Sequence, residues 1–524
     1  MAATGQHGDA DLILGSAPRR ARLTAVSPVP GARDPKLAER VAAAIEADVL
    51  RAGWPVGLVL GSEEQLAARY GVGRAVIREA IRLAEHRQVA RMRRGRGGGL
   101  VVVAPDASAV TESLAIYLEY AQVGIDDLLD ARAMLEVFAA ATAAGSIDEA
   151  GLLALRDAAQ ADDGRAIGAQ AVSGPAGPGA ATRIHELIAE ATGNAALSLF
   201  IQAIVSLSDQ MTRGRADAAA GPGGSAARSA ELGHLAVVEA ITAGDALLAR
   251  DRMREHMTSR HAELARAGSG AMLEPDDPDP GARPAATAGS RPYRPANAVA
   301  TRIRREIVRR GWPVGESLGF EGDLLRKYGV GRAQFREAIR ILEDHSVVRM
   351  QRGAAGGMVV AMPDGRAVVR TASLYLTYQG MNSGHIRDLR EELEAATTRM
   401  AIDRLDAAGE DRLRAMIELE RTWPDEDFPA VSHDLHAVIA ELGGNQTLAL
   451  LLSIVMQLSA ERMYSGDLSR VSESADATRH AHQAIVDAML ARNTALALRR
   501  MRKHLAALAH STLDQPARRP GLRG

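Results

Sequence analysis

Residues 63–85 read EEQLAARYGVGRAVIREAIRLAE, and residues 321–343 read EGDLLRKYGVGRAQFREAIRILE. Both stretches contain YGVGRA and REAIR at a constant offset of 258 residues, and the motif GWPVG precedes them at residues 53–57 and 311–315. Similarity at one fixed offset indicates that a single structural unit occurs twice along the chain. The chain therefore contains two tandem copies of one unit.

Each quoted stretch predicts a helix, a tight turn and a second helix. Ser62 and Gln65 predict a capping box at the start of the first helix, whereas Phe320 stands at the equivalent position of the second copy and lacks this cap. The glycines of YGVG supply the turn, and the second helix is expected from Arg74 to about His86. An upstream helix is expected too, because apolar residues recur there at every fourth position. They are Val41, Ile45 and Val49 in the first copy and Val299, Ile303 and Ile307 in the second.

A β-hairpin is predicted after the second helix. Residues 89–92 and 100–103 flank a turn that is rich in glycine and arginine. A helix, a helix-turn-helix and a basic hairpin together form a winged helix-turn-helix. We expect this fold over residues 35–104 in the first copy and 297–362 in the second.

Positive charge is concentrated on these predicted winged helices. Arg74, Arg78 and Arg82 are spaced by four residues, which places three guanidinium groups on one stripe of a helix. The net charge is +4 over residues 37–103 and +5 over residues 295–361, whereas the whole chain carries −2, so that the remainder carries −11. Basic modules on acidic bodies favour binding to duplex DNA, because neutralised phosphates supply much of the affinity. The alternative is that the arginines only form a solvated helix face. It is disfavoured because the arginine stripe occurs in both copies, each time beside a basic hairpin.

The second part of each copy predicts an antiparallel helical bundle. Residues 108–266 and 364–515 consist mainly of amphipathic segments rich in Ala and Leu. The expected fold class is mainly α, with two copies of a winged helix-turn-helix followed by an all-helical bundle. Residues 267–296, rich in Pro, Gly and acidic side chains, are expected to link the copies, and residues 1–34 and 516–524 to be disordered tails.

Three histidines recur in each predicted bundle. The second and third are 22 residues apart in both copies, and their midpoints, Asp245 and Asn493, lie in predicted interhelical turns. Helices that fold back at these turns would place the two histidines side by side, and the first histidine lies on another helix. Three converging imidazoles suit a divalent metal ion with open positions, zinc being the default choice; the alternative is a metal-free, hydrogen-bonded cluster. The candidate ligands are His185, His234, His256, His436, His482 and His504.

The quoted stretches, each followed by a glycine-rich wing, resemble the GntR family of transcriptional regulators. The helical segment after each of them resembles the effector-binding domain of the FadR subfamily. The resemblance covers nearly all of the chain outside the expected tails and linker. It implies that the start of the recognition helix contacts the operator and that the wing enters the minor groove. The residues concerned are Arg74, Arg78, Arg94 and Gly95 in the first copy, and Arg332, Arg336, Arg352 and Gly353 in the second.

The recognition helix departs from the family pattern. The family usually has Ser at its start, where the chain has Gly73 and Gly331, and a position that is often Thr carries Val76 and Gln334. Gln can hydrogen-bond adenine, whereas Val can only contact a thymine methyl group. The two copies are therefore expected to recognise different half-sites.

The predicted metal site departs from the family pattern too. The resemblance implies an Asp ligand four residues before the first histidine, but Ala181 and Ser432 occupy these positions. A metal with three neutral ligands would bind more weakly or would take an anionic effector as its fourth ligand. Arg132 and Arg390 are candidate anchors for a carboxylate effector. The alternative is an ion pair of each arginine with the glutamate one helical turn later.

Composition limits the other functions that the chain could have. Cysteine is absent, which excludes disulfides, thiolate metal sites and cysteine nucleophiles. No apolar stretch predicts a signal peptide or a membrane span. We therefore expect a cytoplasmic protein without a membrane partner. Histidines without a repeated counterpart, including His345, are expected at the surface.

These features predict an intracellular, sequence-specific transcriptional regulator, with repression implied by the family, and not an enzyme. Its expected partners are a double-stranded DNA operator and a small-molecule, carboxylate effector. Two copies on one chain predict an internal pseudo-dimer or, alternatively, a homodimer with four DNA-binding modules. The rival is a DNA-architectural or protein-interaction module with degenerate sensor domains. Metal-activated hydrolysis is disfavoured, because no general base stands in a fixed relation to the histidines.

Overall fold

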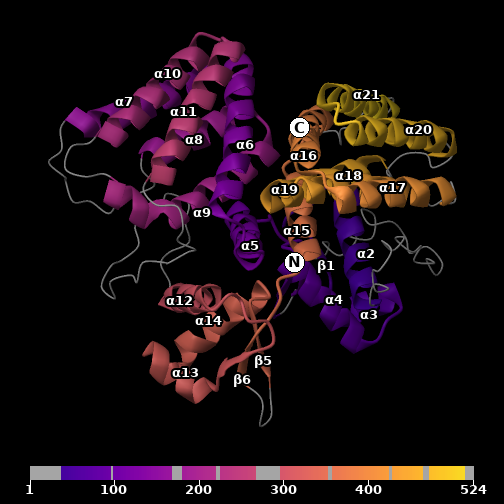
Figure 1. The fold of residues 1–524 in the computed structure, drawn as a ribbon. Coiled ribbons are helices and arrows are strands. Elements are labelled where there is room, and N and C mark those ends of the chain that lie inside the picture. Colours follow the sequence, from indigo (N-terminus) through magenta and orange to yellow (C-terminus); the bar gives the residue numbers. More distant parts are fainter. Residues whose placement is uncertain are drawn as a thin grey trace, which may run out of the picture. The chain divides into compact units, whose positions relative to one another are not determined.

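The computed structural model describes most of both copies. The described ranges are residues 37–95, 98–167, 180–219, 225–266, 295–351, 357–423, 428–463 and 471–513. Within them the fold is mainly helical, as the sequence predicts (Figure 1). The expected tails and most of the expected linker lie outside the described residues, although the first helix of the second copy already begins at Pro295. Among the helices described, none is both long and apolar enough to cross a membrane.

The first winged helix-turn-helix, called winged helix 1, contains the predicted helix-turn-helix and hairpin. Its first helix buries the predicted face of Val41, Ile45 and Val49. The recognition helix extends from Arg74 to His86, as expected. Its elements are α2 (Leu37–Arg51), β1 (Val59–Gly61), α3 (Glu63–Tyr70), α4 (Arg74–His86), β2 (Ala90–Arg93) and β3 (Gly99–Val102).

The second module, called winged helix 2, repeats this order. Val299, Ile303 and Ile307 are buried, as predicted for its first helix. Its elements are α12 (Pro295–Arg309), β4 (Ser317–Gly319), α13 (Glu321–Tyr328), α14 (Arg332–Asp344), β5 (Val348–Gln351) and β6 (Gly357–Val360).

Each wing is a three-stranded antiparallel sheet rather than the two-stranded hairpin that the sequence predicts. The strand orders are β1-β3-β2 and β4-β6-β5, and Met92 lies opposite Leu100 in the predicted hairpin. The additional strand β1 is only three residues long, and its register shifts between Val59 and Gly61. It therefore carries too little alternation to be recognised from the sequence. A Cβ at Gly99 would lie 2.7 Å from the carbonyl oxygen of Gly61, so that this close strand approach requires glycine.

The turns of the helix-turn-helix form as their sequence predicts. The Ser62 hydroxyl accepts a hydrogen bond from the Gln65 amide, and the Gln65 side chain accepts one from the Ser62 amide, which confirms the capping box. Phe320, at the equivalent position, makes no side-chain cap. The helix that follows Ser62 ends at Gly71 with φ 65°, a left-handed conformation that glycine adopts without strain.

Each winged helix is followed in the chain by a connecting helix and a bundle of six helices. The connecting helices are α5 (Ala107–Tyr120) and α15 (Gly365–Tyr378). Bundle 1 consists of α6 (Ile125–Ser146), α7 (Glu149–Ile167), α8 (Ala180–Ala191), α9 (Ala195–Ala219), α10 (Ser225–Thr242) and α11 (Ala246–Arg266). Bundle 2 consists of α16 (Ser383–Arg404), α17 (Ala407–Thr422), α18 (Phe428–Leu442), α19 (Gln446–Met463), α20 (Val471–Leu490) and α21 (Thr494–Leu513).

The interhelical turns fall where the histidine spacing predicts them. In bundle 1, α10 and α11 are joined through Gly244, with φ 71°, and Asp245, whose carboxylate caps the next helix by accepting the Leu248 amide. In bundle 2, Asn493 caps α21 in the same way by accepting the Leu496 amide. The second and third histidines of each copy consequently lie on adjacent antiparallel helices.

The described residues form two compact units, and each unit combines parts of both copies. One unit contains winged helix 1 together with residues 369–444 and the part of bundle 2 beyond residue 451. The other contains bundle 1 and winged helix 2, over residues 108–368, together with residues 445–451. Each winged helix therefore lies in one unit with the bundle of the other copy.

The apolar cores of the winged helices show how this crossing is built. Leu374 of α15 is fully buried in the core that contains Ile77 of winged helix 1. At the equivalent position, Ile116 of α5 is buried in the core that contains Phe335 of winged helix 2. The connecting helix of each copy thus completes the core of the other copy's winged helix.

Candidate functional site

The two recognition helices present arginines at their exposed face. In α4, Ile77 and Ile81 are buried, whereas Arg74 and Arg78 are exposed. The strong amphipathicity of the helix fixes this orientation, because the apolar face is held in the core. Arg332 and Arg336 are exposed at the equivalent positions of α14.

The second arginine of each pair is held by a carboxylate from the preceding helix. Arg78 Nε lies 2.7 Å from Glu63, and Arg336 Nε lies 3.5 Å from Glu321. The arginine side chains remain about two-thirds exposed, at 66% and 71%. These ion pairs orient the guanidinium groups while leaving their outer edges open to a ligand.

The start of α4 and the tip of the wing add further exposed groups. Gly73 provides no side-chain cap, so that no side chain blocks the first amides of the helix. Such amides can donate to phosphate oxygens. Arg94 and Gly95 are exposed at the end of β2, and Gly95 has φ 102°. The corresponding candidates Arg352 and Gly353 lie outside the described residues.

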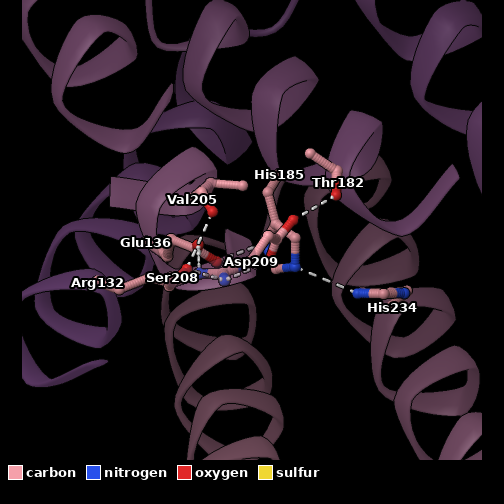
Figure 2. A network of polar contacts seen from close by, with 8 residues as sticks. All are labelled: Arg132, Glu136, Thr182, His185, Val205, Ser208, Asp209 and His234. Carbon is pink, nitrogen blue, oxygen red and sulfur yellow. Dashed lines mark hydrogen bonds and ion pairs between the residues drawn. The ribbon is translucent and has the colours of Figure 1, made fainter. Parts of the chain in front are cut away.

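The three histidines of bundle 1 converge in its interior, as their spacing predicts. His185 comes from α8, His234 from α10 and His256 from α11, and all three are at most 4% exposed. One nitrogen of each lies within 4.8 Å of the others. His234 Nε2 and His185 Nε2 are 3.3 Å apart (Figure 2).

The equivalent histidines of bundle 2 converge in the same way. His436 comes from α18, His482 from α20 and His504 from α21, and their candidate ligand nitrogens also lie within 4.8 Å of one another. His482 Nε2 and His504 Nε2 are 3.2 Å apart. The repeated sequence spacing therefore produces two similar buried clusters.

A buried carboxylate engages the first histidine of each cluster, and the sequence pattern did not assign it this role. Glu136 contacts His185 Nδ1, and Glu394 contacts His436 Nδ1. Both glutamates are 1% exposed. Their cationic and imidazole partners hold the pKa of each carboxyl well below its usual range, although burial opposes this shift. In bundle 2, the ionised carboxylate of Glu394 accepts the Nδ1 proton of His436, which leaves Nε2 with its lone pair toward the cluster.

Bundle 2 has an additional buried carboxyl group, which contacts the second histidine of its cluster. His482 Nδ1 lies 2.9 Å from both carboxylate oxygens of Glu420, which is 1% exposed. Burial raises the pKa of Glu420 to about 8. With Nδ1 engaged, Nε2 is the nitrogen of His482 that faces the other histidines. The residue at the equivalent position of the first copy is Asp162, whose side chain lies outside the described residues.

Burial keeps one histidine of each cluster in the form that can ligate a metal. It lowers the pKa of His256 to about 2 and that of His482 to about 4, so that both imidazoles are neutral at neutral pH. Among the described residues, His256 Nε2 is buried without a hydrogen-bond partner. A buried lone pair of this kind calls for a cation or a donor. Three buried, converging imidazoles therefore fit a divalent metal ion.

The described residues supply no carboxylate ligand to either cluster. Ala181 and Ser432 stand where the family pattern has aspartate, and both side chains lie outside the described residues. A close approach in bundle 1 involves Gly233, because a Cβ there would lie 2.5 Å from His256 Nδ1. The second copy has Ala481 at the equivalent position, so that the two clusters are not identical.

The arginines proposed as effector anchors are buried in ion pairs. Arg132 Nε donates to Glu136 at 2.7 Å, and its Nη1 donates to Ser208 at 2.8 Å (Figure 2). Arg390 Nε donates to Glu394 at 2.6 Å. In each copy, a buried chain of arginine, glutamate and histidine therefore connects the arginine to the cluster.

Comparison with known proteins identifies the two kinds of module. The model of the gntR family of bacterial regulatory proteins matches residues 37–99 and 295–357, and the FCD domain matches residues 127–259 and 385–507. Together these matches cover most of the chain.

The chain belongs to the gntR family of bacterial regulatory proteins.

Its relatives in the family are named as transcriptional regulators. A putative HTH-type transcriptional regulator RmpR from Mycobacterium gastri is 34% identical over 125 residues, 23% of this chain and 44% of that protein. The HTH-type transcriptional repressor NanR from Cronobacter sakazakii is 26% identical over 214 residues, 40% of this chain and 81% of that protein. The chain thus matches less than half the length of the first relative and about four fifths of the second.

Solved structures of similar proteins are gntR regulators as well. A Streptococcus agalactiae GntR aligns with a TM-score of 0.30 and 21% identity, over 43% of this chain and 99% of that chain. A putative GntR regulator from Rhodococcus sp. RHA1 aligns with a TM-score of 0.22 and 17% identity, over 45% and 100%.

The family assignment establishes the general function of this gntR protein. It is a transcriptional regulator with two DNA-binding winged helices and two effector-binding FCD domains, and it is not an enzyme. The prediction of a transcriptional regulator built from two tandem copies is therefore confirmed.

Removal of either buried glutamate should destabilise its FCD domain. Glu394→Ala leaves Arg390 buried without the carboxylate that it contacts, and we expect the free energy of unfolding to fall by about 3–5 kcal/mol. Glu136→Ala should cost less, because Asp209 also lies 3.5 Å from Arg132, whereas Ala460 occupies the equivalent position in the second copy. Denaturant unfolding of the full chain measures both changes.

Glu190→Ala is the control for this comparison. Glu190 forms an exposed ion pair with Arg183 at 3.0 Å, so that its removal should change the stability by less than about 1 kcal/mol. Equal, small losses for all three variants would show that the buried networks do not contribute as described.

Proposed function

We propose that this chain is a repressor that binds an operator of two unlike half-sites, and that a carboxylate effector bound at a metal ion in the FCD domains controls its affinity. The proposal places it in the FadR subfamily and in the cytoplasm, where the operator is accessible. The observation that carries it is the presence of two recognition helices on one chain, each with a pair of exposed arginines.

The DNA-binding part rests on the exposed face of α4 and α14. Arg74 and Arg78 stand within the first turns of α4, the part of a recognition helix that contacts base edges. Arginine can donate two hydrogen bonds to guanine O6 and N7, or it can neutralise a phosphate. Arg332 and Arg336 would do the same from α14, and the wing residues Arg94, Gly95, Arg352 and Gly353 would lie in the minor groove.

The inference of unlike half-sites rests on the residue that lies between the two arginines of each recognition helix. Val76 in α4 offers only methyl groups, whereas Gln334 in α14 offers an amide that can pair with adenine N6 and N7. Each bidentate pair discriminates against the wrong base by about 1–3 kcal/mol. An operator with different halves would fix the direction in which the single chain binds.

The sensing part rests on the two histidine clusters. His185, His234 and His256 would hold one ion, and His436, His482 and His504 a second, with zinc as the default metal. A bound divalent cation would supply positive charge and open coordination positions for an anionic ligand. Because the three protein ligands are neutral, a carboxylate effector complements the site.

The buried arginines would stabilise the bound anion indirectly. Arg132 and Arg390 lie one ion pair away from the clusters, through Glu136 and Glu394. They hold these glutamates ionised and thereby fix the imidazole orientation. We therefore propose that both arginines belong to the effector site as positioning residues, which do not contact the effector themselves.

Selection of the full chain against a random duplex library tests the DNA-binding part. At moderate salt we expect enrichment of a motif with two unlike half-sites. With the selected duplex, Arg74→Ala combined with Arg78→Ala should lower the affinity at least tenfold, through one half-site only. Arg332→Ala with Arg336→Ala should act through the other half-site.

Arg412→Ala combined with Arg414→Ala is the matched control. Both arginines are exposed on α17, a helix of bundle 2, and their removal should leave DNA binding unchanged. Tight binding to every duplex without an enriched motif would instead support a DNA-architectural module.

Metal binding is tested by titration of the metal-free chain with zinc in competition with a chromophoric chelator. We expect one tight site per FCD domain, and the loss of one site in His256→Ala or in His504→Ala. Above pH 8, where Glu420 is ionised, Glu420→Gln should weaken the second site by about 10–100-fold, because the carboxylate orients His482. Glu418→Gln, on the same helix but exposed, should have no effect.

Absence of zinc binding to the native chain would contradict the metal part of the proposal. Equal affinities of the native chain and Glu420→Gln would remove Glu420 from the site while leaving the histidine ligands in place.

A further inference from the structure

The two winged helices dock on connecting helices by the same apolar contacts. Tyr378 of α15 packs against Trp54 of winged helix 1, with ring centroids 5.5 Å apart. Tyr120 of α5 packs against Trp312 of winged helix 2 at 5.7 Å. These aromatic pairs, like Leu374 and Ile116 in the cores, occupy equivalent positions in the two copies. The apolar contacts alone therefore do not decide which winged helix docks on which connecting helix.

The charged contacts beside these rings are reversed between the two docking surfaces. In winged helix 1, Glu46 of α2 accepts from Arg370 of α15, with Arg370 Nη2 at 2.7 Å and Nε at 2.8 Å. In winged helix 2, the position equivalent to Glu46 is Arg304, and the position equivalent to Arg370 is Glu112. Arg304 Nη1 lies 3.3 Å from Glu112.

The charged groups next to these two pairs also differ between the two docking surfaces. Arg87 also contacts Glu46 in winged helix 1, whereas His345 at the equivalent position contacts Ser113 Oγ at 3.2 Å and Glu112 at 3.7 Å. His345 is therefore partly buried at this docking surface, and the expectation that it lies at the surface was wrong. Glu119 of α5 adds a further carboxylate, 3.3 Å from Arg304 Nε.

These charges are buried enough for their sign to matter. Glu46 is 0% exposed and the Arg304 side chain 13% exposed. Leaving a buried charge unpaired, or opposite a like charge, costs far more than losing an exposed ion pair.

Docking within one copy would bring like charges together. Winged helix 1 on its own α5 would set Glu46 against Glu112 and Glu119, with Arg87 as the remaining cation. Winged helix 2 on its own α15 would set Arg304 against Arg370. Two identical copies from separate chains would meet the same mismatch, because each would present the same winged helix to the same connecting helix.

We propose that this charge reversal specifies the partner of each winged helix: it docks on the connecting helix of the unlike copy, which in this structure belongs to the same chain. The reversed pair acts as a specificity device, because it favours the crossed arrangement and penalises docking within one copy and pairing of like copies. The interaction surface of one copy is complementary to the other copy and not to itself. Any effect of an FCD domain that passes through its connecting helix consequently reaches the winged helix of the other copy.

Cross-linking can report which docking occurs, because the native chain has no cysteine. Gln122 Nε2 donates to the Gly311 carbonyl at 3.0 Å, so that Gln122→Cys with Arg310→Cys reports crossed docking of winged helix 2. Gln122→Cys with Ala52→Cys, at the position equivalent to Arg310, reports docking of winged helix 1 on its own α5. A short bismaleimide joins the cysteines, and gel mobility separates links within a chain from links between chains.

In the chain with native charges at the docking surfaces, we expect the cross-link to form between positions 122 and 310 of the same chain. Glu46→Arg combined with Arg304→Glu reverses both winged helices and leaves the connecting helices unchanged. This variant should shift the ratio of the two links at least tenfold toward positions 122 and 52. Glu46→Gln with Arg304→Gln is the neutral control and should shift the ratio less.

A second variant separates specificity from folding. Glu46→Arg, Arg87→His, Arg370→Glu and Thr377→Glu together give the first docking surface the charged groups that the second one already accommodates. This chain should fold, but both connecting helices now suit either winged helix, so that both links should form. An unchanged ratio in the reversed and in the equalised chain, or native links formed mainly between chains, would overturn the proposal. The cross-links are read without DNA or metal, and their outcome is therefore independent of the proposed function.

Discussion

The packing of a connecting helix into the winged helix of the other copy is the contact on which the remaining organisation depends. A winged helix of this size buries limited apolar surface by itself, and Leu374 and Ile116 complete the two cores. Each DNA-binding module is therefore stabilised by a helix that continues directly into an FCD domain. Because the connecting helix belongs to the core, a change in its position would alter the position of the winged helix.

Within the FCD domains, burial determines the chemistry. In the low-dielectric interior, an arginine and a glutamate form a buried ion pair beside each histidine cluster, and burial lowers the pKa of His256 and of His482. The two domains are similar and yet distinct. Asp209 supports Arg132 in the first, whereas Glu420 supports His482 in the second. A duplicated sensor with different supporting groups can respond to different concentrations of the same ligand.

Local signals in the sequence were sufficient to predict most helices and turns. The repeated histidine spacing was sufficient to predict the two histidine clusters. The limits of the recognition helix, the Ser62 cap and the turns at Asp245 and Asn493 depend on contacts within a few residues, and they form as predicted. The strand β1 was missed because three residues with a broken register show no periodicity. The crossed docking was missed because both copies carry the same apolar pattern, and the difference lies in charged pairs such as Glu46 and Arg304. The roles of Glu136 and Glu394 required the fold, since the histidines that they contact are distant in sequence.

We propose that one chain carries both halves of a DNA-binding pseudo-dimer. Sedimentation equilibrium of the chain with a selected duplex, which contains both half-sites, measures the mass of the complex directly. The account predicts one chain per duplex across the concentration range in which binding saturates. A complex of two chains on one duplex would contradict it, because each half-site would then be occupied by a separate polypeptide.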